Sequence, residues 1–250
     1  MKLTTFITGA TSGIGKATAQ LFAKNNCKLI LCGRRAEKLL ELKEELSALT
    51  EVHTLQFDVR NNNQVQKAIN SLPEDFKNID VLINNAGNAH GLQPIQTGSI
   101  EDWDAMIDGN VKGLLYVSKA IIPNMVARNS GFIVNIGSIA AKQVYPNGNV
   151  YCASKYAVDA INKGMRIDLN KHNIRVSGIH PGAVETEFSE VRFKGDVAKA
   201  KTVYEGYKAL QADDIADIIY FVVTRPYHVN IEDLVVYPTA QATATILNKA

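Results

Sequence analysis

The feature that most constrains the fold of this chain is a regular alternation of short apolar runs with longer segments of helical period. The runs expected as strands are Leu3–Thr8, Lys28–Cys32, His53–Phe57, Val81–Asn84, Gly131–Ile136, Ile174–His180 and Asp233–Tyr237. The segments expected as helices are Ile14–Asn25, Ala36–Ala48, Asn63–Ser71, Glu101–Arg128, Val150–Lys171 and Ala212–Thr224. Nearly continuous apolar strands are typical of a parallel sheet covered on both faces. The sequence therefore predicts a doubly wound α/β fold of about seven strands.

The composition narrows the possible partners. The 250 residues are 46% hydrophobic and 21% charged, which is typical of a globular protein and not of a disordered one. The net charge is +2 and the longest basic run is Arg34-Arg35, which argues against nucleic acid and an anionic membrane surface. The longest apolar runs fall short of the roughly 20 residues that span a bilayer. We expect a protein that binds neither nucleic acid nor membrane.

Residues 1–250 are expected to form a single domain, because no linker, repeat or low-complexity segment interrupts them. The three cysteines form no CxxC spacing, so a reduced, cytoplasmic compartment is expected. His53, His90, His172 and His228 form no ligand spacing with cysteines or carboxylates, and no metal site is expected. The long region Pro181–Ala212 lacks clear periodicity, which indicates a substrate-binding loop or lid.

The first expected strand leads through a glycine-rich turn directly into a helix. The run Thr8-Gly9-Ala10-Thr11-Ser12-Gly13-Ile14-Gly15 has GxxxGxG spacing, a variant of the dinucleotide-binding fingerprint. Its glycines would permit a tight turn, close approach of a pyrophosphate and close helix–strand packing, while the helix N-terminus offers N–H groups. A glycine-rich turn of another α/β protein is the alternative. The strand before and the helix after favour a Rossmann-type cradle made of Gly9, Thr11, Ser12, Gly13, Ile14 and Gly15.

The end of the second expected strand separates NADP from NAD. An NAD enzyme usually places a carboxylate there for the ribose hydroxyls. This chain instead has Gly33-Arg34-Arg35, and guanidinium groups bind a 2′-phosphate that a carboxylate would repel. Alternatively, both arginines form a solvated helix start, although cations are disfavoured at helix N-termini. We predict NADP as the cofactor, with Arg34 and Arg35 at its 2′-phosphate.

Two further segments fit the same ligand. Asp58 and Val59 follow the third expected strand, where Asp58 would lie near the adenine amine or, equally, act as a plain helix N-cap. The run Asn84-Asn85-Ala86-Gly87 ends the fourth strand at the carboxyl edge of the sheet, where such folds bind ligands. The small residues in this run permit close approach to ribose, so Asn85, Ala86 and Gly87 are further candidates.

A possible acid–base group lies on the fifth expected helix. Tyr151 and Lys155 are four residues apart, so both side chains share one helix face. An adjacent ammonium should lower the pKa of the phenol, which could then exchange a proton with a hydroxyl or carbonyl oxygen. Ser138, just beyond the fifth strand, would donate a hydrogen bond to that oxygen, and Asn110 could anchor a water that relays protons to Lys155. Each residue alone is more often a helix pair or a strand-end cap, and only their joint order indicates catalysis.

With these motifs the chain resembles the short-chain dehydrogenase/reductase family over essentially all of its length. The matching residues are Thr8-Gly9-x-x-x-Gly13-x-Gly15, Asn84-Asn85-Ala86-Gly87, Asn110, Ser138, Tyr151-x-x-x-Lys155 and Pro181-Gly182. The resemblance implies a catalytic tetrad of Asn110, Ser138, Tyr151 and Lys155, a seven-stranded fold and a homotetramer. It also implies that Lys155 and Tyr151 contact the cofactor and that the nicotinamide end is held by Pro181, Gly182, Val184 and Thr186.

Three further segments are similar to NADP-dependent 3-hydroxy acid dehydrogenases, a group that acts on serine, L-allo-threonine and malonic semialdehyde. They are residues 147–151, 187–196 and 226–231. A carboxylate substrate would suit Arg192 as a clamp beside Ser138 and Tyr151, although a surface or subunit-contact arginine is an equal alternative. His180 replaces an acid found in close relatives, and the loop after Gly182 is one residue shorter. A carbonyl or 3-oxoacyl reductase and a non-catalytic nucleotide-binding module are the competing functions.

Overall fold

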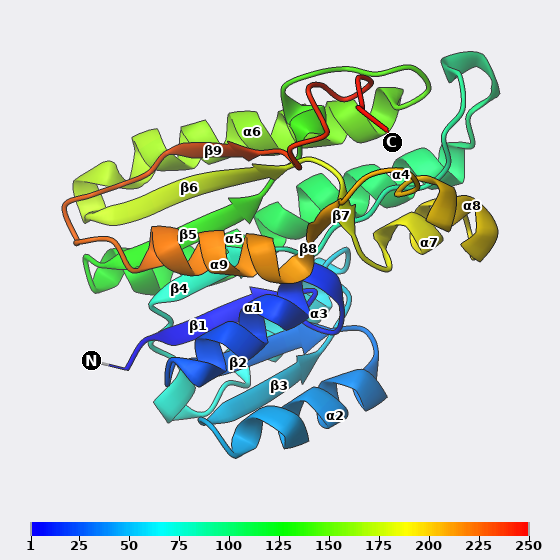
Figure 1. Ribbon diagram of the computed structural model, residues 1–250. Helices are drawn as coiled ribbons and strands as arrows, with labels where there is room; N and C mark the ends of the chain where they lie inside the picture. The colour runs from blue at the N-terminus through cyan, green and yellow to red at the C-terminus, as the bar shows by residue number, and fades with distance from the viewer. Residues whose placement is uncertain (1, 250) are drawn as a thin grey trace.

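All seven apolar runs form strands of one parallel sheet in the computed structural model, which describes residues 2–249 (Figure 1). The strand order is β3-β2-β1-β4-β5-β6-β9. The strands are β1 (Thr4–Thr8), β2 (Lys28–Gly33), β3 (Val52–Gln56), β4 (Val81–Asn84), β5 (Gly131–Ile136), β6 (Ile174–Pro181) and β9 (Asp233–Val236). The order reverses between β1 and β4, so the carboxyl ends of these strands flank the crevice where such sheets bind ligands. The predicted doubly wound fold is confirmed.

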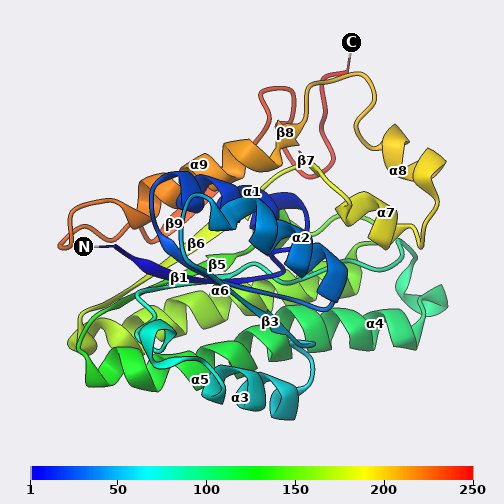
Figure 2. The same ribbon diagram turned by 90° about the horizontal axis from the view of Figure 1, so that it is seen from below.

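Helices cover both faces of the sheet (Figure 2). One face carries α1 (Gly13–Lys24), α2 (Ala36–Ser47) and α9 (Ala212–Val223). The other face carries α3 (Asn62–Asn70), α5 (Gly113–Ala127) and α6 (Asn149–Leu169). Short 3₁₀ turns occupy Glu74–Phe76, Ile95–Thr97, Ile139–Ala141 and Asn170–His172. Each predicted helix forms, with ends that differ by at most two residues from those expected.

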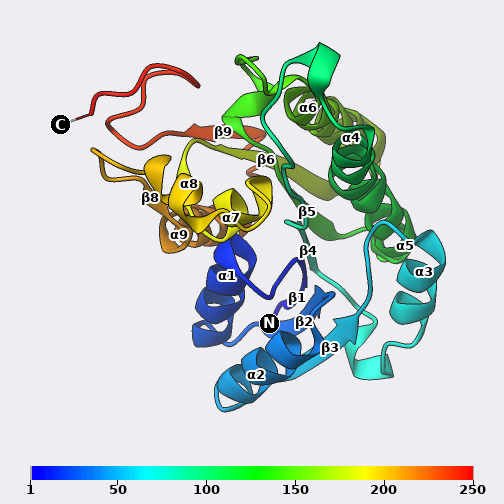
Figure 3. The ribbon, with the colours of Figure 1, turned by 90° about the vertical axis from the view of Figure 1, so that its right-hand side faces the viewer.

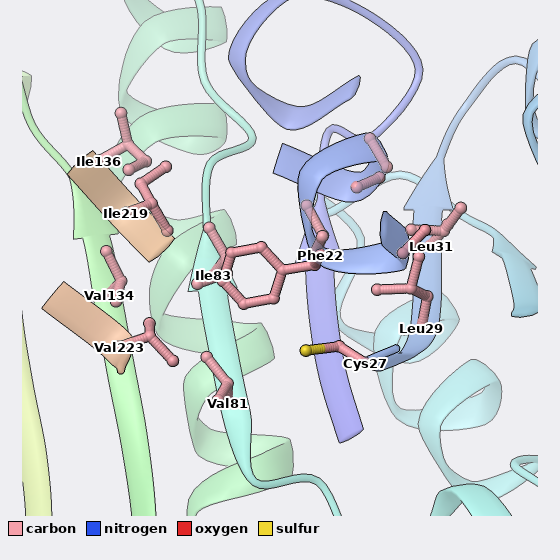
Figure 4. Packing of buried hydrophobic residues seen from close by; sticks show 14 of the residues in the cluster. Phe22, Cys27, Leu29, Leu31, Val81, Ile83, Val134, Ile136, Ile219 and Val223 are labelled. Carbon is pink, nitrogen blue, oxygen red and sulfur yellow. The ribbon is translucent and has the colours of Figure 1, made fainter. Parts of the chain in front are cut away.

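The packing on the α1 face fixes the position of the glycine-rich turn. Phe22 of α1 is fully buried against Ile83 of β4 (Figure 4). The Phe22 ring also meets the Tyr220 ring of α9 edge-on, at 5.3 Å between centroids. Burial of such an aromatic side chain contributes about 1.5–3 kcal/mol. Because α1 is clamped between the sheet and α9, its N-terminus is held above the carboxyl ends of β1 and β4.

The predicted helix Glu101–Arg128 forms, but it is not uniform. It consists of α4 (Ile100–Ile107), a π-helical turn over Asp108–Lys112 and α5. A π-turn inserts one extra residue per turn into a helix and is frequent at functional sites. Asn110 lies within this turn and is 2% exposed.

The region Pro181–Ala212 contains more regular structure than its sequence suggests. It forms α7 (Phe188–Arg192), α8 (Val197–Thr202) and a two-stranded parallel ribbon of β7 (Val184–Glu185) and β8 (Leu210–Gln211). Figure 3, which looks along the sheet from its carboxyl edge, shows α7 and α8 in front of that edge. The helices are too short to produce a readable period in the sequence, which is why they were not expected.

The structure also bears on membrane-spanning helices and on the state of the cysteines. Among residues 2–249, no helix has both the length and the apolar character needed to cross a membrane. The three cysteines are free thiols, and all of them are buried. Burial of Cys152 beside Tyr151 agrees with a structural role for this thiol.

Candidate active site

The glycine-rich turn has the backbone that a dinucleotide cradle requires. Gly9 and Gly13 adopt φ values of +64° and +50°, which favour glycine strongly. A Cβ on Gly15 would lie 2.3 Å from the Gly9 carbonyl oxygen, so only glycine allows this approach of helix and strand. The side chain of the N-cap residue Ser12 makes no capping hydrogen bond, which leaves the first N–H groups of α1 open to a phosphate.

A cavity of about 600 Å³ runs from this turn across the carboxyl edge of the sheet. Its volume is in the range of small-molecule sites. Nearly all the predicted cofactor-binding residues line it, namely Gly9, Thr11, Ser12, Gly13, Ile14, Arg34, Arg35, Asp58, Val59, Asn85, Ala86, Gly87, Tyr151, Lys155, Pro181, Gly182, Val184 and Thr186. Ser138 and Arg192 also line the cavity, whereas Gly15 and Asn110 lie behind its wall. The residues present therefore fit a dinucleotide that extends from Arg34 to Tyr151.

The two arginines after β2 are placed differently. Arg34 is exposed at the cavity rim, whereas the Arg35 guanidinium donates to Thr11 Oγ1 and forms an ion pair of 2.8 Å with Glu187. Lys38 also contacts Glu187, at 2.9 Å. Burial opposes the charge of Glu187, but hydrogen bonds from Arg35 and Lys38 outweigh it and lower the pKa of this carboxyl. Sequence reasoning missed Glu187 and Lys38, because α7 and α2 meet only in the folded chain.

Asp58 lies at the cavity but does not cap a helix. Asn61 is the N-cap of α3, where its side chain accepts from the Gln64 N–H, so the N-cap alternative for Asp58 is wrong. Arg60 instead donates to both carboxylate oxygens of Asp58. Burial raises the pKa of Asp58, but these hydrogen bonds dominate and hold it below its usual range.

Asn85 holds the glycine-rich turn in place by hydrogen bonds to its backbone. Its side-chain amide donates to the carbonyl oxygens of Thr8 and Gly9, and the Thr8 hydroxyl accepts from the Asn85 and Ala86 N–H groups. A Cβ on Gly87 would lie 2.9 Å from Asn110 Oδ1. The β4 motif therefore holds β1 and the π-turn in register around the cavity.

The four catalytic candidates come from three segments that meet at this edge. Tyr151 and Lys155 of α6 are buried, with 8% and 6% exposure. Ser138 follows β5, its Oγ accepts from the Ala140 N–H, and it lines the same cavity as Tyr151. Asn110 donates to Asn88 O and Ser154 Oγ and accepts from the Asn88 N–H. Both side-chain polar atoms of Asn110, Oδ1 and Nδ2, thus already hydrogen-bond with protein groups.

The expected effect of Lys155 on Tyr151 is not found. Lys155 Nζ lies 6.0 Å from the centre of the Tyr151 ring and donates to the Ile136 carbonyl at 3.0 Å. Burial raises the pKa of Tyr151 well above its ordinary value, and hydrogen bonding from Ser138 only partly offsets this. Burial also lowers the pKa of Lys155, to about 8. The prediction was wrong because the sequence does not show how deeply both groups are buried.

Arg192 of α7 reaches into the cavity above Tyr151. Its guanidinium carbon lies 5.5 Å from the centres of the Tyr151 and Tyr145 rings, and Nη2 donates to Tyr145 Oη at 2.8 Å. The Phe188 ring packs beside Tyr151 at 5.8 Å. The Arg192 side chain therefore faces the cavity rather than only the surface. Tyr145 and Phe188 were missed because the sequence offers no motif for them.

Three side chains of the kinds that bind metal ions lie close together in the structure, although their spacing in the sequence did not indicate it. Asp159 of α6, His180 of β6 and Asp233 of β9 place one ligand atom each within 4.8 Å of one another. The ammonium of Lys142 lies 2.9 Å from Asp159 Oδ1 and 2.6 Å from Asp233 Oδ2. This cation already neutralises the carboxylates.

A family model for short chain dehydrogenases matches residues 3–196, a span that includes the glycine-rich turn and all four catalytic candidates. The chain belongs to the short-chain dehydrogenase family. The resemblance drawn from the motifs is confirmed, and with it the prediction of an oxidoreductase.

Relatives match this short-chain dehydrogenase over nearly its whole length. The NADP-dependent 3-hydroxy acid dehydrogenase of Salmonella typhi is 47% identical over 239 residues, 95% of this chain and 96% of the relative. Sulfoacetaldehyde reductase 2 of Chromohalobacter salexigens is 46% identical over 237 residues, 94% of each chain. The structure of the closed form of serine dehydrogenase complexed with NADP⁺ has a TM-score of 0.93 at 44% identity and covers 97% of both chains. These names agree with the predicted cofactor and substrate class.

Proposed function

We propose that this short-chain dehydrogenase is an NADP(H)-dependent oxidoreductase that interconverts a small 3-hydroxy acid and its 3-oxo or semialdehyde form. The observation that carries the proposal is the placement of Arg192 above the Tyr151 ring in a cavity that also contains the glycine-rich turn. The Arg192 guanidinium, which can bind an anion, thus lies next to Tyr151, the proposed proton-transfer group. The relatives named for 3-hydroxy acids and for sulfoacetaldehyde, which carries a sulfonate, support an anionic substrate.

The cofactor assignment rests on the fit of the residues. The glycine cradle and the free N-terminus of α1 suit a pyrophosphate, and Arg34 with Arg35 suits a 2′-phosphate. When bound, NADP(H) supplies or accepts the hydride. Asp58 and Val59 would lie at the adenine, and Pro181, Gly182, Val184 and Thr186 at the nicotinamide end.

The chain's own residues then handle the proton. In reduction, the Tyr151 hydroxyl gives its proton to the carbonyl oxygen of the substrate while the carbonyl carbon receives the hydride. Ser138 donates a hydrogen bond to the same oxygen and stabilises the developing negative charge. Lys155, with a pKa of about 8, exchanges protons near neutral pH and is the group through which Tyr151 regains its proton. In oxidation, each step runs in reverse.

The substrate proposal is tested by spectrophotometry of NADPH. We expect oxidation of NADPH with malonic semialdehyde or sulfoacetaldehyde, and reduction of NADP⁺ with L-serine, L-allo-threonine or 3-hydroxypropionate. Arg192→Met should raise KM for these acids by about tenfold or more, because the charge-assisted pair with the acid group is lost. A neutral aldehyde of similar size should be little affected. Turnover of only a long acyl thioester would contradict the substrate class, and absence of all turnover would favour a nucleotide-binding module.

We also propose that the protein is a cytoplasmic homotetramer. Three free, buried thiols suit a reducing compartment. Large apolar side chains are exposed on the two long helices, namely Leu115 on α5 and Tyr156 and Ile167 on α6. Such residues favour burial between subunits. Light scattering coupled to gel filtration should give four times the chain mass, and a monomeric mass would contradict this assembly.

A further inference from the structure

A cluster of charged side chains joins the elements that carry the catalytic residues. Lys142 follows the 3₁₀ turn after Ser138, and Asp159 lies one helical turn after Lys155 on α6. His180 and Asp233 come from the neighbouring strands β6 and β9. Lys142 bridges the two carboxylates, and Lys163 pairs with Asp159 at 2.8 Å. His180 is the member of this cluster that touches the Ser138 segment.

The His180 ring is held rigidly beside that segment. It is 1% exposed, and its Nδ1 lies 3.3 Å from the carbonyl oxygen of Ser138. A Cβ on Gly137 would lie 2.3 Å from Nδ1, and one on Gly178 would lie 2.7 Å from Nε2. The imidazole is therefore packed between two glycines, and its contact with Ser138 is fixed by shape as well as by hydrogen bonding.

The surroundings indicate which ring nitrogen carries the proton. Nε2 lies 3.0 Å from Asp233 Oδ1 and 3.7 Å from Asp159 Oδ1, but it has no aligned hydrogen-bond partner among the described residues. Burial lowers the pKa of His180, although Asp233 and Asp159 oppose this effect. A neutral ring has one N–H, and the aligned contact is that of Nδ1. Because the Ser138 carbonyl can only accept, this aligned contact is a hydrogen bond when Nδ1 carries the proton.

This hydrogen bond acts on a residue whose orientation matters for the chemistry. Ser138 has extended backbone, with φ −174° and ψ 160°, and its hydroxyl is aligned by the Ala140 N–H. Rotation of the Ser138 peptide would carry the hydroxyl away from Tyr151. The Ser138 carbonyl accepts from the Ala141 N–H at 2.8 Å, and the His180 contact adds a second hydrogen bond that resists that rotation.

We propose that His180 is a positioning residue for Ser138: its Nδ1–H anchors the Ser138 carbonyl and so holds the hydroxyl against Tyr151 and the substrate oxygen. The role rests on the proposed function, because it has a kinetic effect only where Ser138 takes part in turnover.

A pair of amide variants separates the two ring nitrogens. Asn in His180→Asn places its amide N–H where Nδ1 lies, whereas Gln in His180→Gln places its amide near Nε2 and loses the contact with Ser138. Both variants remove the ring from between Gly137 and Gly178, so each controls for the lost packing of the other. Their thermal midpoints should fall by similar amounts.

The kinetic results should differ between the variants. We expect kcat to fall roughly ten- to a hundredfold in His180→Gln, with KM and NADPH affinity little changed, because the lost contact matters only in the transition state. His180→Asn should recover most of that loss. The charged groups around the ring, Lys142, Asp159, Lys163 and Asp233, are the same in both variants.

Two outcomes would overturn the inference: equal kcat losses in the two variants, or no loss in His180→Gln. Nitrogen NMR adds a readout independent of activity, in which Nδ1 should be the protonated nitrogen, and protonation at Nε2 alone would contradict the assignment. Ser138→Ala separates this inference from the proposed function. If Ser138→Ala keeps turnover, the proposed role of Ser138 is wrong. If it loses turnover while His180→Gln does not, only the role of His180 fails.

Discussion

At the scale of single residues, burial sets the chemistry of this site as much as charge does. Tyr151 and Lys155 share one helix face and are both nearly buried. Burial favours the neutral form of each group, raising the pKa of the phenol and lowering that of the ammonium. Tyr151 therefore holds its proton at neutral pH, which is the form that carbonyl reduction requires of a general acid.

Tyr151→Phe tests this proton transfer directly. Removal of the hydroxyl should reduce kcat by about a hundredfold or more, because general acid–base catalysis contributes that much. The affinity for NADPH, measured by fluorescence titration, should stay within about twofold of wild type, since the phenyl ring keeps its packing against Phe188. Substantial turnover by this variant would show that another group supplies the proton.

The parts of the site that depend on local residue spacing were predictable from the sequence, whereas the parts that depend on long-range contacts were not. The glycine turn and the Tyr151–Lys155 pair have fixed local spacing, so sequence alone places them at one sheet edge. Glu187 contacts Arg35 across 152 positions, and no local pattern reports such a contact. The sign of the Tyr151 pKa shift was also missed, because it depends on the burial that the whole fold produces.

At the scale of elements, the π-turn over Asp108–Lys112 is the feature that brings a helix interior into the site. Its Asn110 ties the segment after β4 to α6 by hydrogen bonds to Asn88 and Ser154. The predicted single helix was correct in extent, but the π-turn shifts the apolar pattern by a single residue, which a period taken over the whole segment does not resolve. The sequence period therefore could not reveal the turn.

Asn110→Ala should lower both the stability of the folded protein and its turnover, because it removes these hydrogen bonds. The partly buried N–H and C=O of Asn88 would lose their partner, which should lower the free energy of unfolding by about 1–3 kcal/mol. The kcat should fall as well. Asn124→Ala, at an exposed position of α5, is the control and should change stability by at most about 0.5 kcal/mol. Urea unfolding measures both, and equal effects would contradict this account.

The contact between α7 and the start of α2 links the lid region to the predicted 2′-phosphate site. Glu187 pairs with Arg35 and Lys38, and its carboxylate would lie close to the 2′-phosphate. In Glu187→Gln this like-charge repulsion is removed, so NADPH should bind about three- to tenfold more tightly at low salt.

The affinity of Glu187→Gln for NADH, which lacks the 2′-phosphate, should not change. Glu190→Gln, an exposed position on the same helix, should leave both affinities unchanged. Fluorescence titration at low and high salt provides the measurement. Weaker NADPH binding in Glu187→Gln would show instead that the ion pairs serve to close the lid.

At the scale of the whole molecule, Lys155, the proposed catalytic lysine, destabilises the folded state rather than stabilising it. Lys155 is buried with one hydrogen bond, to the Ile136 carbonyl, and no carboxylate pairs with it among residues 2–249. A pKa lowered from 10.5 to about 8 corresponds to a cost of about 3 kcal/mol in folding stability at pH 7.

Lys155→Met should therefore abolish turnover and yet raise the free energy of unfolding by about 1–3 kcal/mol at pH 7 without cofactor, since the lost hydrogen bond offsets part of the gain. The cost of the wild-type ammonium is fully present below pH 8 and vanishes as the pH rises past 10.5, because the folded chain releases this proton before the unfolded chain does. The stability gain of the variant should consequently shrink between these pH values. Lys163→Met, on the exposed side of the same helix, should change stability by about 0.5 kcal/mol at most. A lower stability of Lys155→Met in urea unfolding at pH 7 would mean that Lys155 is stabilised in the folded protein, and that its proton is not available near neutral pH.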